Sequence, residues 1–247
     1  MDKTFMETKG YTFIRTLGEG AFGKVLKAES YRLKKLKKEI PRSLIHPNII
    51  RTYDIFTSRN RTVYVVMELC PNGDLKHLST SKGTLEEGLS CRLFKQLCLA
   101  IQYLHGINIA HRDIKCDNLL LDTNYNLKLC DFSFSERLTY NDGKLVLSSD
   151  FCGTPNYEAP EILKHLPYNP KLSDVWSMGI VFNEMLFGSL PFKNRNQHKF
   201  MQLPMKRRIT FPTTSSVSTQ AKELIHSILQ PVPEHRITIL RCDWHPA

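Results

Sequence analysis

The sequence predicts an α+β protein in which a small β-rich N-terminal part precedes a larger, mainly α-helical C-terminal part. Two observations support this fold class. Segments rich in β-branched and aromatic residues fall before Gly73, and apolar residues recur with a helical period after it. The boundary is expected at Pro71, Asn72 and Gly73, because proline and glycine interrupt regular structure. With 247 residues, the chain is long enough for one large domain or two small lobes around a sizeable core.

Strands are expected mainly in the N-terminal part. Residues 11–15 and 24–28 flank a glycine-rich turn, and residues 61–67 are rich in β-branched and aromatic side chains. A further strand is expected over residues 127–130, where apolar and polar residues alternate.

Helices are expected in the C-terminal part, where the apolar residues follow a helical period. Ser173 and Ser218 are the expected N-caps of the two later helices. Cys91 and Cys98 lie one heptad apart, so we expect both as buried thiols on one helix face. The predicted helices span residues 90–105, 172–186 and 218–229.

The composition excludes several classes of protein. The chain carries 34 Lys and Arg against 24 Asp and Glu, and 41% of its residues are hydrophobic, which is ordinary for a soluble globular protein. No apolar run approaches the roughly 18–20 residues of a membrane helix, and the N-terminus has no apolar signal region. Seven scattered cysteines indicate thiols in a reducing compartment. We therefore expect a cytoplasmic protein without a disulfide framework or a zinc site.

The formal charge of +10 has two interpretations. A basic surface attracts nucleic acid, an anionic membrane or an acidic partner. Alternatively, the charge lies on a solvated surface with one lysine-rich patch. We favour the second interpretation, because the only dense basic run is residues 32–38 and no aromatic residues interleave there, as base stacking requires. Neither nucleic acid nor a membrane is therefore expected as a partner.

Residues 17–25 follow the pattern G-x-G-x-x-G-x-V, with glycines at Gly18, Gly20 and Gly23. Glycine lets the backbone approach a phosphate closely and present its N–H groups to it. The motif is weak by itself, because a glycine-rich turn is as often structural. It differs from the dinucleotide-binding fingerprint, in which a helix rather than a strand follows the glycines.

Residues 111–118 form the most specific motif. A carboxylate, an amine and an amide recur within six positions, at Asp113, Lys115 and Asn118. Transfer of a phosphoryl group requires these parts: a carboxylate that accepts the proton of the attacking hydroxyl, a cation that offsets phosphate charge, and an amide oxygen that holds a metal. The alternative is an exposed polar loop between two helices, which the motifs that follow disfavour.

Asp131 would be a second metal ligand if the strand over residues 127–130 delivers it to the same place as Asn118. Its spacing from Asn118 makes the pair informative, since isolated Asp-Phe pairs are common. Two further motifs lie at residues 153–161 and 174–179, and the second of them is expected to open a helix.

In this order the motifs resemble the eukaryotic protein kinase domain over nearly the whole chain. The resemblance implies a two-lobed protein kinase-like fold over residues 11–247, with an N-lobe over about residues 11–70 and a C-lobe over about residues 74–247. It also implies transfer of the ATP γ-phosphate to Ser or Thr of protein substrates, with ATP and Mg²⁺ as cofactors. Shorter phrases are similar to the testis-specific serine/threonine kinases, within the calmodulin-dependent and AMP-activated-like group, which implies a role in spermatogenesis. These phrases lie at residues 67–70, 116–122, 131–135 and 166–170.

The resemblance implies a role for each motif residue. Asp113 would be the catalytic base, Lys115 would neutralise the γ-phosphate, and Asn118 and Asp131 would hold magnesium. Met67 would be the gatekeeper beside the adenine. The cofactor-binding residues that it implies are Leu17, Gly18, Gly20, Gly23, Val25, Lys34, Glu68, Cys70, Leu120 and Asp131.

Supporting roles follow from the same resemblance. Arg112 is expected to contact the activation segment, and Thr154 to help set specificity for a hydroxyl substrate. Asp174 is expected to brace the catalytic loop, and Glu161 to pair with Arg236 as a structural bridge.

Acidic residues suggest how substrates and activity are controlled. Asp74, Asp117 and Glu184 match positions where basophilic kinases bind arginines ahead of the phosphoacceptor, so substrates with upstream basic residues are one hypothesis and ordinary surface acids are the other. Asp150 falls where the resembling branch carries a phosphorylatable Thr. One hypothesis is that the carboxylate of Asp150 lies near Arg112 and partly mimics a phosphate. The alternative is that Asp150 is an ordinary solvated acid of a loop.

The N-lobe departs from the family pattern over about residues 29–45. The match resumes at His46, roughly 25–30 residues too early, so the usual ATP-anchoring Lys strand and most of the next helix are missing. Lys34 is the best replacement for that Lys, and Glu39 is the remnant of the helix Glu, although Pro41 limits any helix there.

Three readings of the function therefore stay open. The chain is an active kinase in a shortened form, or a natural degenerate kinase that serves as a pseudokinase or scaffold, or a binder of nucleic acid or anionic surfaces through residues 32–38. We favour descent from an active enzyme, because only the chemistry requires Asp113, Lys115, Asn118 and Asp131 together.

Overall fold

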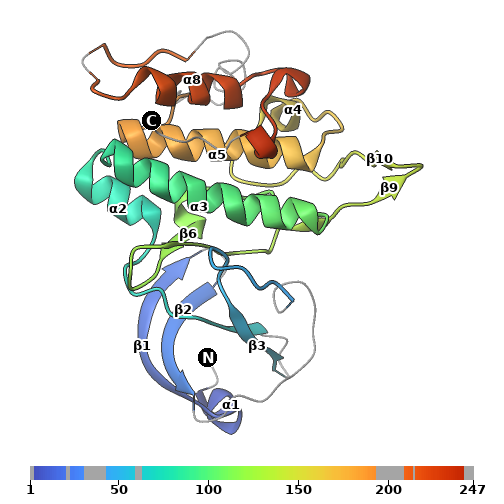
Figure 1. Cartoon of the computed structure of the whole chain (residues 1–247). Coiled ribbons are helices and arrows are strands. Elements are labelled where there is room, and N and C mark those ends of the chain that lie inside the picture. The colour runs from blue at the N-terminus through green and yellow to red at the C-terminus, as the bar shows by residue number, and fades with distance from the viewer. Residues whose placement is uncertain are drawn as a thin grey trace. The chain divides into compact units, whose positions relative to one another are not determined.

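The computed structural model describes residues 3–20, 23–30, 43–58, 63–192, 209–213 and 215–241. The chain divides into two compact units, one of Met1–Ile45 with Ile50–Leu69 and one of His46–Ile49 with Cys70–Ala247. The first unit is mainly β and the second mainly helical, which confirms the α+β class (Figure 1). Lys34, Glu39 and the basic run over residues 32–38 lie outside the described residues.

The described residues of the first unit form one short helix and two antiparallel strand pairs. The predicted strands over residues 11–15 and 24–28 are confirmed, and both continue into the glycine-rich turn, where Gly20 lies opposite Gly23. The third predicted strand is confirmed from Val63 on, whereas the strand before it was not predicted. The elements are α1 (Lys3–Thr8), β1 (Tyr11–Gly20) paired with β2 (Gly23–Ser30), and β3 (Thr52–Thr57) paired with β4 (Val63–Met67).

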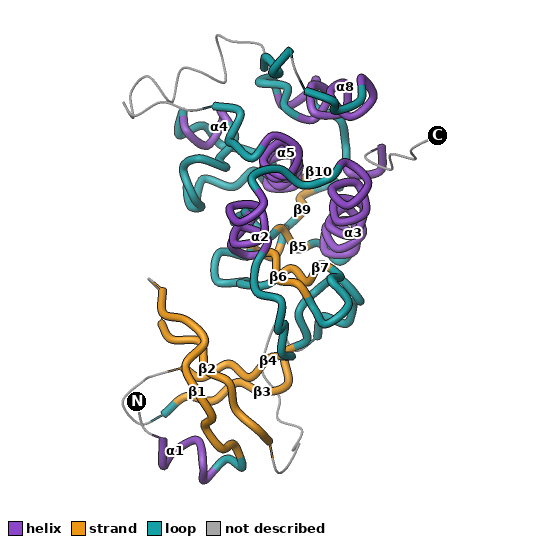
Figure 2. The backbone as a smooth tube through the Cα atoms, turned by 90° about the vertical axis from the view of Figure 1, so that its left-hand side faces the viewer, coloured by secondary structure: helices purple, strands orange, loops and turns teal. Residues whose placement is uncertain are grey.

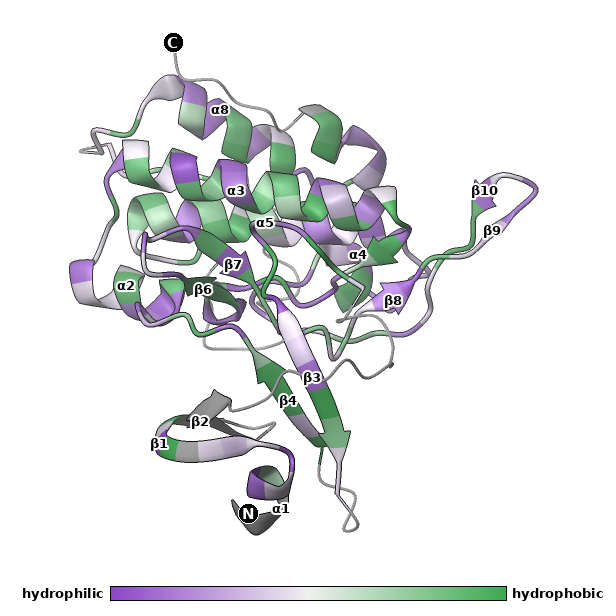
Figure 3. Cartoon of the chain, turned by 60° about the horizontal axis from the view of Figure 1, so that its bottom comes forward, coloured by the Kyte–Doolittle hydropathy of each residue, from purple (hydrophilic) through white to green (hydrophobic). Residues whose placement is uncertain are grey.

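Tyr11 links the two strand pairs of this unit. Its buried hydroxyl donates to Oδ2 of Asp54 in β3 at 2.7 Å, and its ring meets Phe56 edge to face with centroids 5.8 Å apart. Figure 3 colours most of β4 as hydrophobic, and Val63 and Val65 are nevertheless exposed. One face of β4 is therefore apolar and open to solvent.

The second unit is built on three main helices, with short strands and 3₁₀ turns between them. The helices are α2 (Leu75–Lys82), α3 (Glu87–Gly106), α4 (Pro160–Leu163), α5 (Pro170–Phe187) and α8 (Thr219–Ile228), and the 3₁₀ turns are η2 (Cys116–Asn118), η3 (Pro233–His235) and η4 (Ile239–Arg241). The short strands are β5 (Ile109–Ala110), β6 (Leu119–Leu121), β7 (Leu127–Leu129), β8 (Glu136–Arg137), β9 (Tyr140–Asn141) and β10 (Lys144–Leu145).

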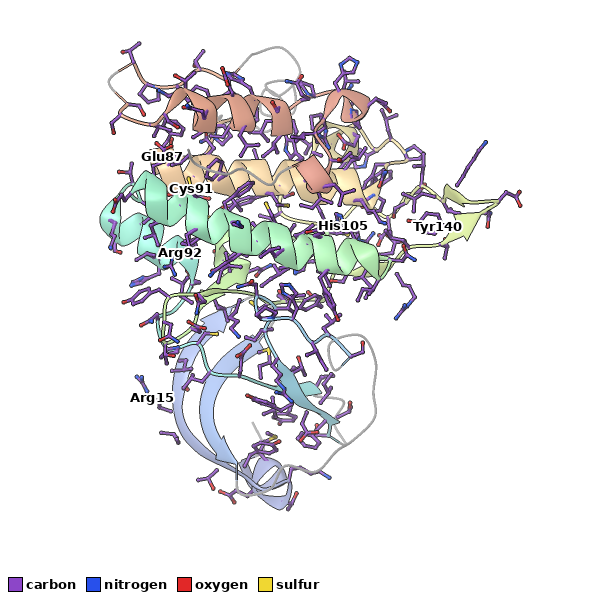
Figure 4. The ribbon with its side chains drawn as sticks, in the orientation of Figure 1. Arg15, Glu87, Cys91, Arg92, His105 and Tyr140 are labelled. Carbon is purple, nitrogen blue, oxygen red and sulfur yellow. The ribbon has the colours of Figure 1, made fainter. Side chains whose placement is uncertain are left out.

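Helices α3, α5 and α8 form successive layers (Figure 1). Phe94 of α3 stacks on Phe182 of α5 with ring centroids 4.4 Å apart. The three predicted helices are confirmed with ends that differ by a few residues, and Cys91 and Cys98 are buried in α3 as predicted. Figure 4 shows Glu87 and Cys91 near the start of α3 and His105 near its end.

The predicted N-cap Ser218 is confirmed, and the predicted N-cap Ser173 is wrong. Ser218 accepts the N–H of Ala221, and Glu87 of α3 accepts the Ser218 backbone N–H at 2.8 Å. The N-cap of α5 is Asn169, which accepts the N–H of Lys171 at 3.0 Å and is followed by Pro170 in the first turn. Proline suits the first helical position, so α5 starts one turn earlier and Ser173 becomes a buried interior residue.

Residues 46–49 belong to the second unit although they lie early in the chain. The carbonyl of Asn48 accepts the N–H of Leu129 at 2.8 Å, and the Asn48 amide donates to the carbonyl of Leu127 at 3.0 Å. His46 stacks on Tyr103 of α3 with ring centroids 5.2 Å apart. Asn48 thus fastens this short segment to the edge of β7.

The short strands carry the segments that contain the sequence motifs. β6 pairs with β7 and β5 pairs with β8, both antiparallel, and Figure 2 shows β5, β6 and β7 beside α2 and α3. β9 and β10 form a hairpin that extends away from the helices (Figure 3). Among the described residues, no helix is long and apolar enough to span a membrane.

Gly179 offers a test of the packing between α5 and α8. A methyl group there would lie 2.5 Å from Cγ2 of Ile228, and such overpacking costs about 1–3 kcal/mol, more than the roughly 1 kcal/mol that Ala gains over Gly in a helix. We expect Gly179→Ala to lower the free energy of unfolding by up to about 2 kcal/mol in a denaturant titration. The control is Gly88→Ala in α3, where a methyl group meets nothing within 4 Å and stability should hold or rise. Equal effects of the two substitutions would contradict this packing.

Candidate functional site

The loop over residues 111–118 is anchored from α5 by one buried carboxylate. Oδ2 of Asp174 accepts the backbone N–H of His111 at 2.9 Å, and Oδ1 accepts that of Arg112 at 2.8 Å. These bonds confirm the predicted contact of Asp174 with the loop. Arg112 has a φ of 66°, a left-handed conformation that is strained for a side chain of its size. The two bonds from Asp174 help to hold that conformation.

Asp113 is the centre of a network that the loop forms with a distant segment. Its side chain accepts from Nζ of Lys115 and from Oγ1 of Thr154, each at 2.7 Å, and Lys115 also donates to Thr154 at 2.9 Å. The amide nitrogen of Asn118 donates to Asp113 Oδ2 at 3.0 Å. Asp113 is only 3% exposed. The structure therefore brings together the predicted Asp113, Lys115, Asn118 and Thr154.

Asp131 lies beside Asn118 because of the strand pairing. β6 and β7 are antiparallel with Leu119 opposite Leu129, and the N–H of Cys130 donates to the carbonyl of Asn118 at 3.0 Å. The start of one strand and the end of the other therefore meet at one end of the pair. This pairing realises the expected delivery of Asp131 to the neighbourhood of Asn118.

The backbone at Asp131 is left-handed, with a φ of 61°. The following segment holds it: Oδ1 of Asp131 accepts from Oγ of Ser133 at 2.6 Å and from its N–H at 3.2 Å. The ring of Phe132 packs edge to face on His111 with centroids 5.1 Å apart, and a ring nitrogen of His111 lies 3.0 Å from the carbonyl oxygen of Cys130. Burial lowers the pKa of His111 despite the nearby Asp174.

The free oxygens near Asn118 fit a divalent cation. Asn118 uses its amide nitrogen toward Asp113, which leaves the amide oxygen as a ligand atom, and Asp131 bonds Ser133 through Oδ1, which leaves Oδ2. Proteins hold Mg²⁺ through one or two carboxylates together with substrate phosphates and water. The donor set of this chain therefore suits Mg²⁺ in the company of a phosphate ligand.

The guanidinium of Arg112 forms hydrogen bonds and an ion pair with the segment that follows Asp131. Nε donates to the carbonyl of Phe134 at 2.7 Å and an NH2 group donates to Oδ2 of Asp150 at 2.9 Å. A carboxylate oxygen of Glu136 lies 2.9 Å from the guanidinium, as an ion pair that is not aligned as a hydrogen bond. The Arg112 side chain is 6% exposed. These contacts confirm that Arg112 reaches the predicted segment and that Asp150 lies beside it.

Glu184 is the centre of a second buried network. Its Oε1 pairs with Nζ of Lys76 at 2.5 Å, and its Oε2 accepts from the Tyr157 hydroxyl at 2.5 Å and from the Cys116 thiol at 3.2 Å. Glu184 is 3% exposed, so its charge is compensated inside the protein. Burial lowers the pKa of Lys76, but the bond and charge of Glu184 outweigh it and the net pKa is raised.

The burial that surrounds Glu184 keeps its neighbours protonated. Burial, followed by the charge of Glu184, raises the pKa of the Cys116 thiol well above its ordinary value. Burial likewise raises the pKa of the Tyr157 hydroxyl. Both groups therefore stay donors at neutral pH.

The other two acids of the substrate hypothesis differ from Glu184. Asp74 is the N-cap of α2 and accepts the N–H of His77 at 2.7 Å, whereas Asp117 is exposed in η2.

The predicted bridge between Glu161 and Arg236 is confirmed, with bidentate bonds of 2.8 and 3.0 Å.

The residues predicted to bind a nucleotide lie in both units. In the first, Gly18 lies opposite Val25 in the β1–β2 register, Leu17 is exposed, and Oε1 of Glu68 accepts the N–H of Arg51 at 2.8 Å. In the second, Cys70 is half-buried and Leu120 lies in β6.

Sequence reasoning missed several residues that the structure places near the loop. Lys76, Tyr157 and Glu136 complete networks around Glu184 and Arg112, and Glu158 lines a small hollow together with Asp113. Their partners lie far away along the chain, so no local pattern could have identified them. Tyr157 and Glu158 lie within the motif at residues 153–161, but that motif gave no role to either of them.

The comparisons with known proteins agree with these motifs. A family model described as "Protein kinase domain" matches residues 34–246, a range that begins after the glycine-rich hairpin. The human "Testis-specific serine/threonine-protein kinase 1" is 40% identical over 261 residues, which covers 96% of this chain and 71% of that protein. The mouse "Testis-specific serine/threonine-protein kinase 3" is 37% identical over 98% of this chain and 97% of that protein.

A further match is the yeast (Saccharomyces cerevisiae) "Serine/threonine-protein kinase GIN4", which is 38% identical over 84% of this chain and 18% of that protein. The matches to the two testis-specific kinases run over 261 and 264 residues, more than the 247 residues of this chain. The compared region therefore includes positions that this chain lacks. From the family model, the length of these matches and the motifs, we conclude that the chain belongs to the protein kinase family, with relatives among the serine/threonine-protein kinases.

Proposed function

We propose that the chain transfers the γ-phosphate of ATP to Ser or Thr residues of protein substrates, with Mg²⁺. The observation that carries this proposal is the network in which Lys115, Thr154 and Asn118 all bond the buried carboxylate of Asp113. A degenerate site has no reason to keep a carboxylate, a cation and an amide in mutual contact. This network supports the proposal, because a carboxylate, a cation and an amide are among the groups that phosphoryl transfer uses.

In this proposal Asp113 accepts the proton of the substrate hydroxyl. Thr154 bonds Oδ1 of Asp113 and Lys115 bonds Oδ2, so the carboxylate is held in one orientation. Lys115 offsets charge on the transferred phosphate, since its ammonium lies beside Asp113. Bound Mg²⁺ would neutralise phosphate charge, and Asn118 and Asp131 are the residues that would hold it.

The nucleotide would be held by the residues implied by the family resemblance. Gly18, Gly20 and Gly23 would cover its phosphates, and Glu68 and Cys70 would bond the adenine through their backbone. Leu17, Val25 and Leu120 would pack against the base, and Lys34 would anchor the phosphates. The protein kinase domain would extend over residues 11–247, with lobes at about 11–70 and 74–247, and we propose a cytoplasmic location.

A pseudokinase or scaffold is the second candidate. The observation that favours it is that the relatives are matched over more positions than this chain has, so part of the kinase domain is shorter here. Loss of a positioned cation beside a phosphate can remove several kcal/mol of transition-state stabilisation. The two candidate functions therefore predict different rates of phosphoryl transfer and different affinities for the nucleotide.

Asp113→Asn tests the base. We expect phosphate incorporation into a basic serine peptide to fall by about 10²–10⁴-fold, because a positioned general base contributes that much. The protein should stay folded, since the oxygen of Asn can accept from Lys115 and Asn118 while its NH2 group donates to the hydroxyl of Thr154. The matched control is Asp142→Asn, an exposed acid at the tip of the β9–β10 hairpin, which should keep the rate. Equal rates for Asp113→Asn and wild type would remove Asp113 from the mechanism.

Magnesium-dependent nucleotide binding separates the enzyme from the scaffold. Mg-ATP at about 100 times its Kd should stabilise the wild type by about 2.7 kcal/mol and raise its Tm by several degrees. We expect Asp131→Asn to lose the magnesium-dependent part of that rise, because it removes a charged oxygen ligand. Thermal unfolding with ATP, with and without Mg²⁺, measures the rise in Tm of the wild type and of Asp131→Asn. No rise in the wild type would favour the scaffold.

Asp150 is expected to support activity without phosphorylation. Its carboxylate lies on Arg112, which belongs to the same loop as Asp113, and a carboxylate partly reproduces a phosphate in such a position. Asp150 is 71% exposed, so the pair contributes at most about 1 kcal/mol, or about fivefold in rate. We expect Asp150→Ala to lower the initial rate two- to fivefold, as a rough estimate on that basis, and Asp150→Glu to retain most of it.

The control for Asp150→Ala is Glu223→Ala, which changes the charge equally at an exposed site in α8. The protein must be confirmed as unphosphorylated by mass spectrometry before the rates are compared. An unchanged rate in Asp150→Ala would show that Asp150 is only a solvated loop acid.

A further inference from the structure

Glu184 holds two segments that are far apart in the sequence. Its Oε2 accepts from the thiol of Cys116 in η2 and from the hydroxyl of Tyr157. Tyr157 is in turn fixed to the turn that contains Thr154, because its backbone N–H donates to the Thr154 carbonyl at 2.8 Å. One carboxylate oxygen therefore joins the loop over residues 111–118 to the Thr154 turn.

The same two segments supply groups that bond the carboxylate of Asp113. Lys115, the neighbour of Cys116 in the chain, and Thr154 each donate to it at 2.7 Å, and Lys115 also donates to Thr154 at 2.9 Å. The geometry around Asp113 therefore depends on how the two segments are held relative to each other. A contact that ties them together close to these donors also controls that geometry.

Glu184 needs a compensating charge to hold these segments. It is 3% exposed, and a buried charge is costly unless a cation pairs with it. Among the described residues, its ion pair is with Lys76, whose ammonium lies 2.5 Å from Oε1, while Tyr157 and Cys116 bond Oε2. Without the cation, a buried carboxylate moves toward water or becomes neutral, and either change disturbs the bonds that its other oxygen accepts.

The start of α2 places Lys76 beside the loop. Asp74, the N-cap of α2, forms a β-bridge with Leu120 of β6, and the carbonyl of Gly73 accepts the N–H of Leu121 at 2.9 Å. The strand β6 directly follows the 3₁₀ turn η2. These backbone bonds therefore fasten α2 next to the end of the loop, with Lys76 in the first turn of the helix.

We propose that Lys76 is a positioning residue, which acts through Glu184 to hold the loop over residues 111–118 and the Thr154 turn in the arrangement that bonds Asp113. This inference rests on the proposed kinase function and adds a residue of α2 to the groups that support its site. A neutral side chain at position 76 should slow phosphoryl transfer more than it weakens nucleotide binding, because the glycine-rich hairpin proposed to cover the nucleotide is not part of this network.

The first experiment separates transfer from nucleotide binding in variants of the full chain. We expect Lys76→Met to lower kcat for a serine peptide about tenfold or more with an unchanged KM for ATP, because a small misplacement of reacting groups costs up to about 10²-fold. Lys76→Arg keeps the charge and should retain most of the rate. The control is Lys82→Met, which removes the same charge at an exposed position of α2 and should match the wild type.

A double substitution shows whether Lys76 acts through Glu184. In Glu184→Gln the charge that Lys76 compensates is absent, so the addition of Lys76→Met should change kcat by no more than about twofold. The double variant buries no unpaired charge, so it tests the proposal even if Lys76→Met alone does not fold. An unchanged kcat in Lys76→Met, a large further loss in the double variant, or an equal loss in Lys82→Met would overturn the proposal.

The second experiment does not depend on catalysis. Amide hydrogen exchange of residues 111–118 and 153–158 is compared without nucleotide in the wild type, Lys76→Met and Lys82→Met. We expect both segments to lose protection in Lys76→Met and neither to lose it in Lys82→Met, because Glu184 holds both. This paired loss in a chain that phosphorylates no peptide would contradict the proposed function and support this inference. Unchanged protection, or a loss confined to one segment, would overturn it.

Discussion

The loop over residues 111–118 depends on Asp174, a buried carboxylate that accepts the backbone N–H groups of His111 and Arg112. These bonds come from α5, which packs on α3 and α8, so the loop conformation is coupled to the most buried helix of the second unit. A charged acceptor forms stronger hydrogen bonds than a neutral one, especially where water is excluded. The left-handed backbone of Arg112 can persist because this surrounding structure determines it.

Helix α5 supplies more than this one anchor. Glu184, near its end, bonds Cys116 of the loop and Tyr157 of the distant segment that also provides Thr154. Ser177 donates to the carbonyl of Tyr157 at 2.8 Å. Helix α5 therefore positions both the loop over residues 111–118 and the segment that contains Thr154 and Tyr157. This explains how Thr154 and Lys115 can both bond the carboxylate of Asp113.

Charge compensation distinguishes the acids of this site from one another. Glu161 pairs with the buried Arg236, whereas Glu184 pairs with Lys76, whose side chain is 42% exposed. Asp150 pairs with the buried guanidinium of Arg112 although its own side chain is 71% exposed, and Glu158 forms no ion pair among the described residues. An ion pair that forms inside the protein leaves little charge for a ligand, whereas an uncompensated carboxylate retains its attraction. The fold therefore neutralises some acids of this site internally and leaves others exposed to solvent.

Much of the fold and part of the site follow from local sequence. The periodicity of α3, α5 and α8 and the strands around the glycine turn were predictable, because helix and strand patterns repeat over a few residues. Ser173 misled the prediction, because Asn169 and Pro170 together start a helix more strongly than a single Ser. Asp113, Lys115 and Asn118 lie within six positions, so their meeting in one loop was also predictable.

The tertiary structure decided the contacts that join distant segments. Asp131 reaches Asn118 only through the pairing of β6 with β7, and Asp150 reaches Arg112 across 38 positions of the chain. The sequence by itself determined which chemical groups the protein carries and the order of its helices and strands. A carboxylate can anchor a loop, form an internal ion pair or stay exposed to solvent. Which of these it does depends on its burial and on partners far away in the chain, and the packing around α5 determines both the burial and the partners.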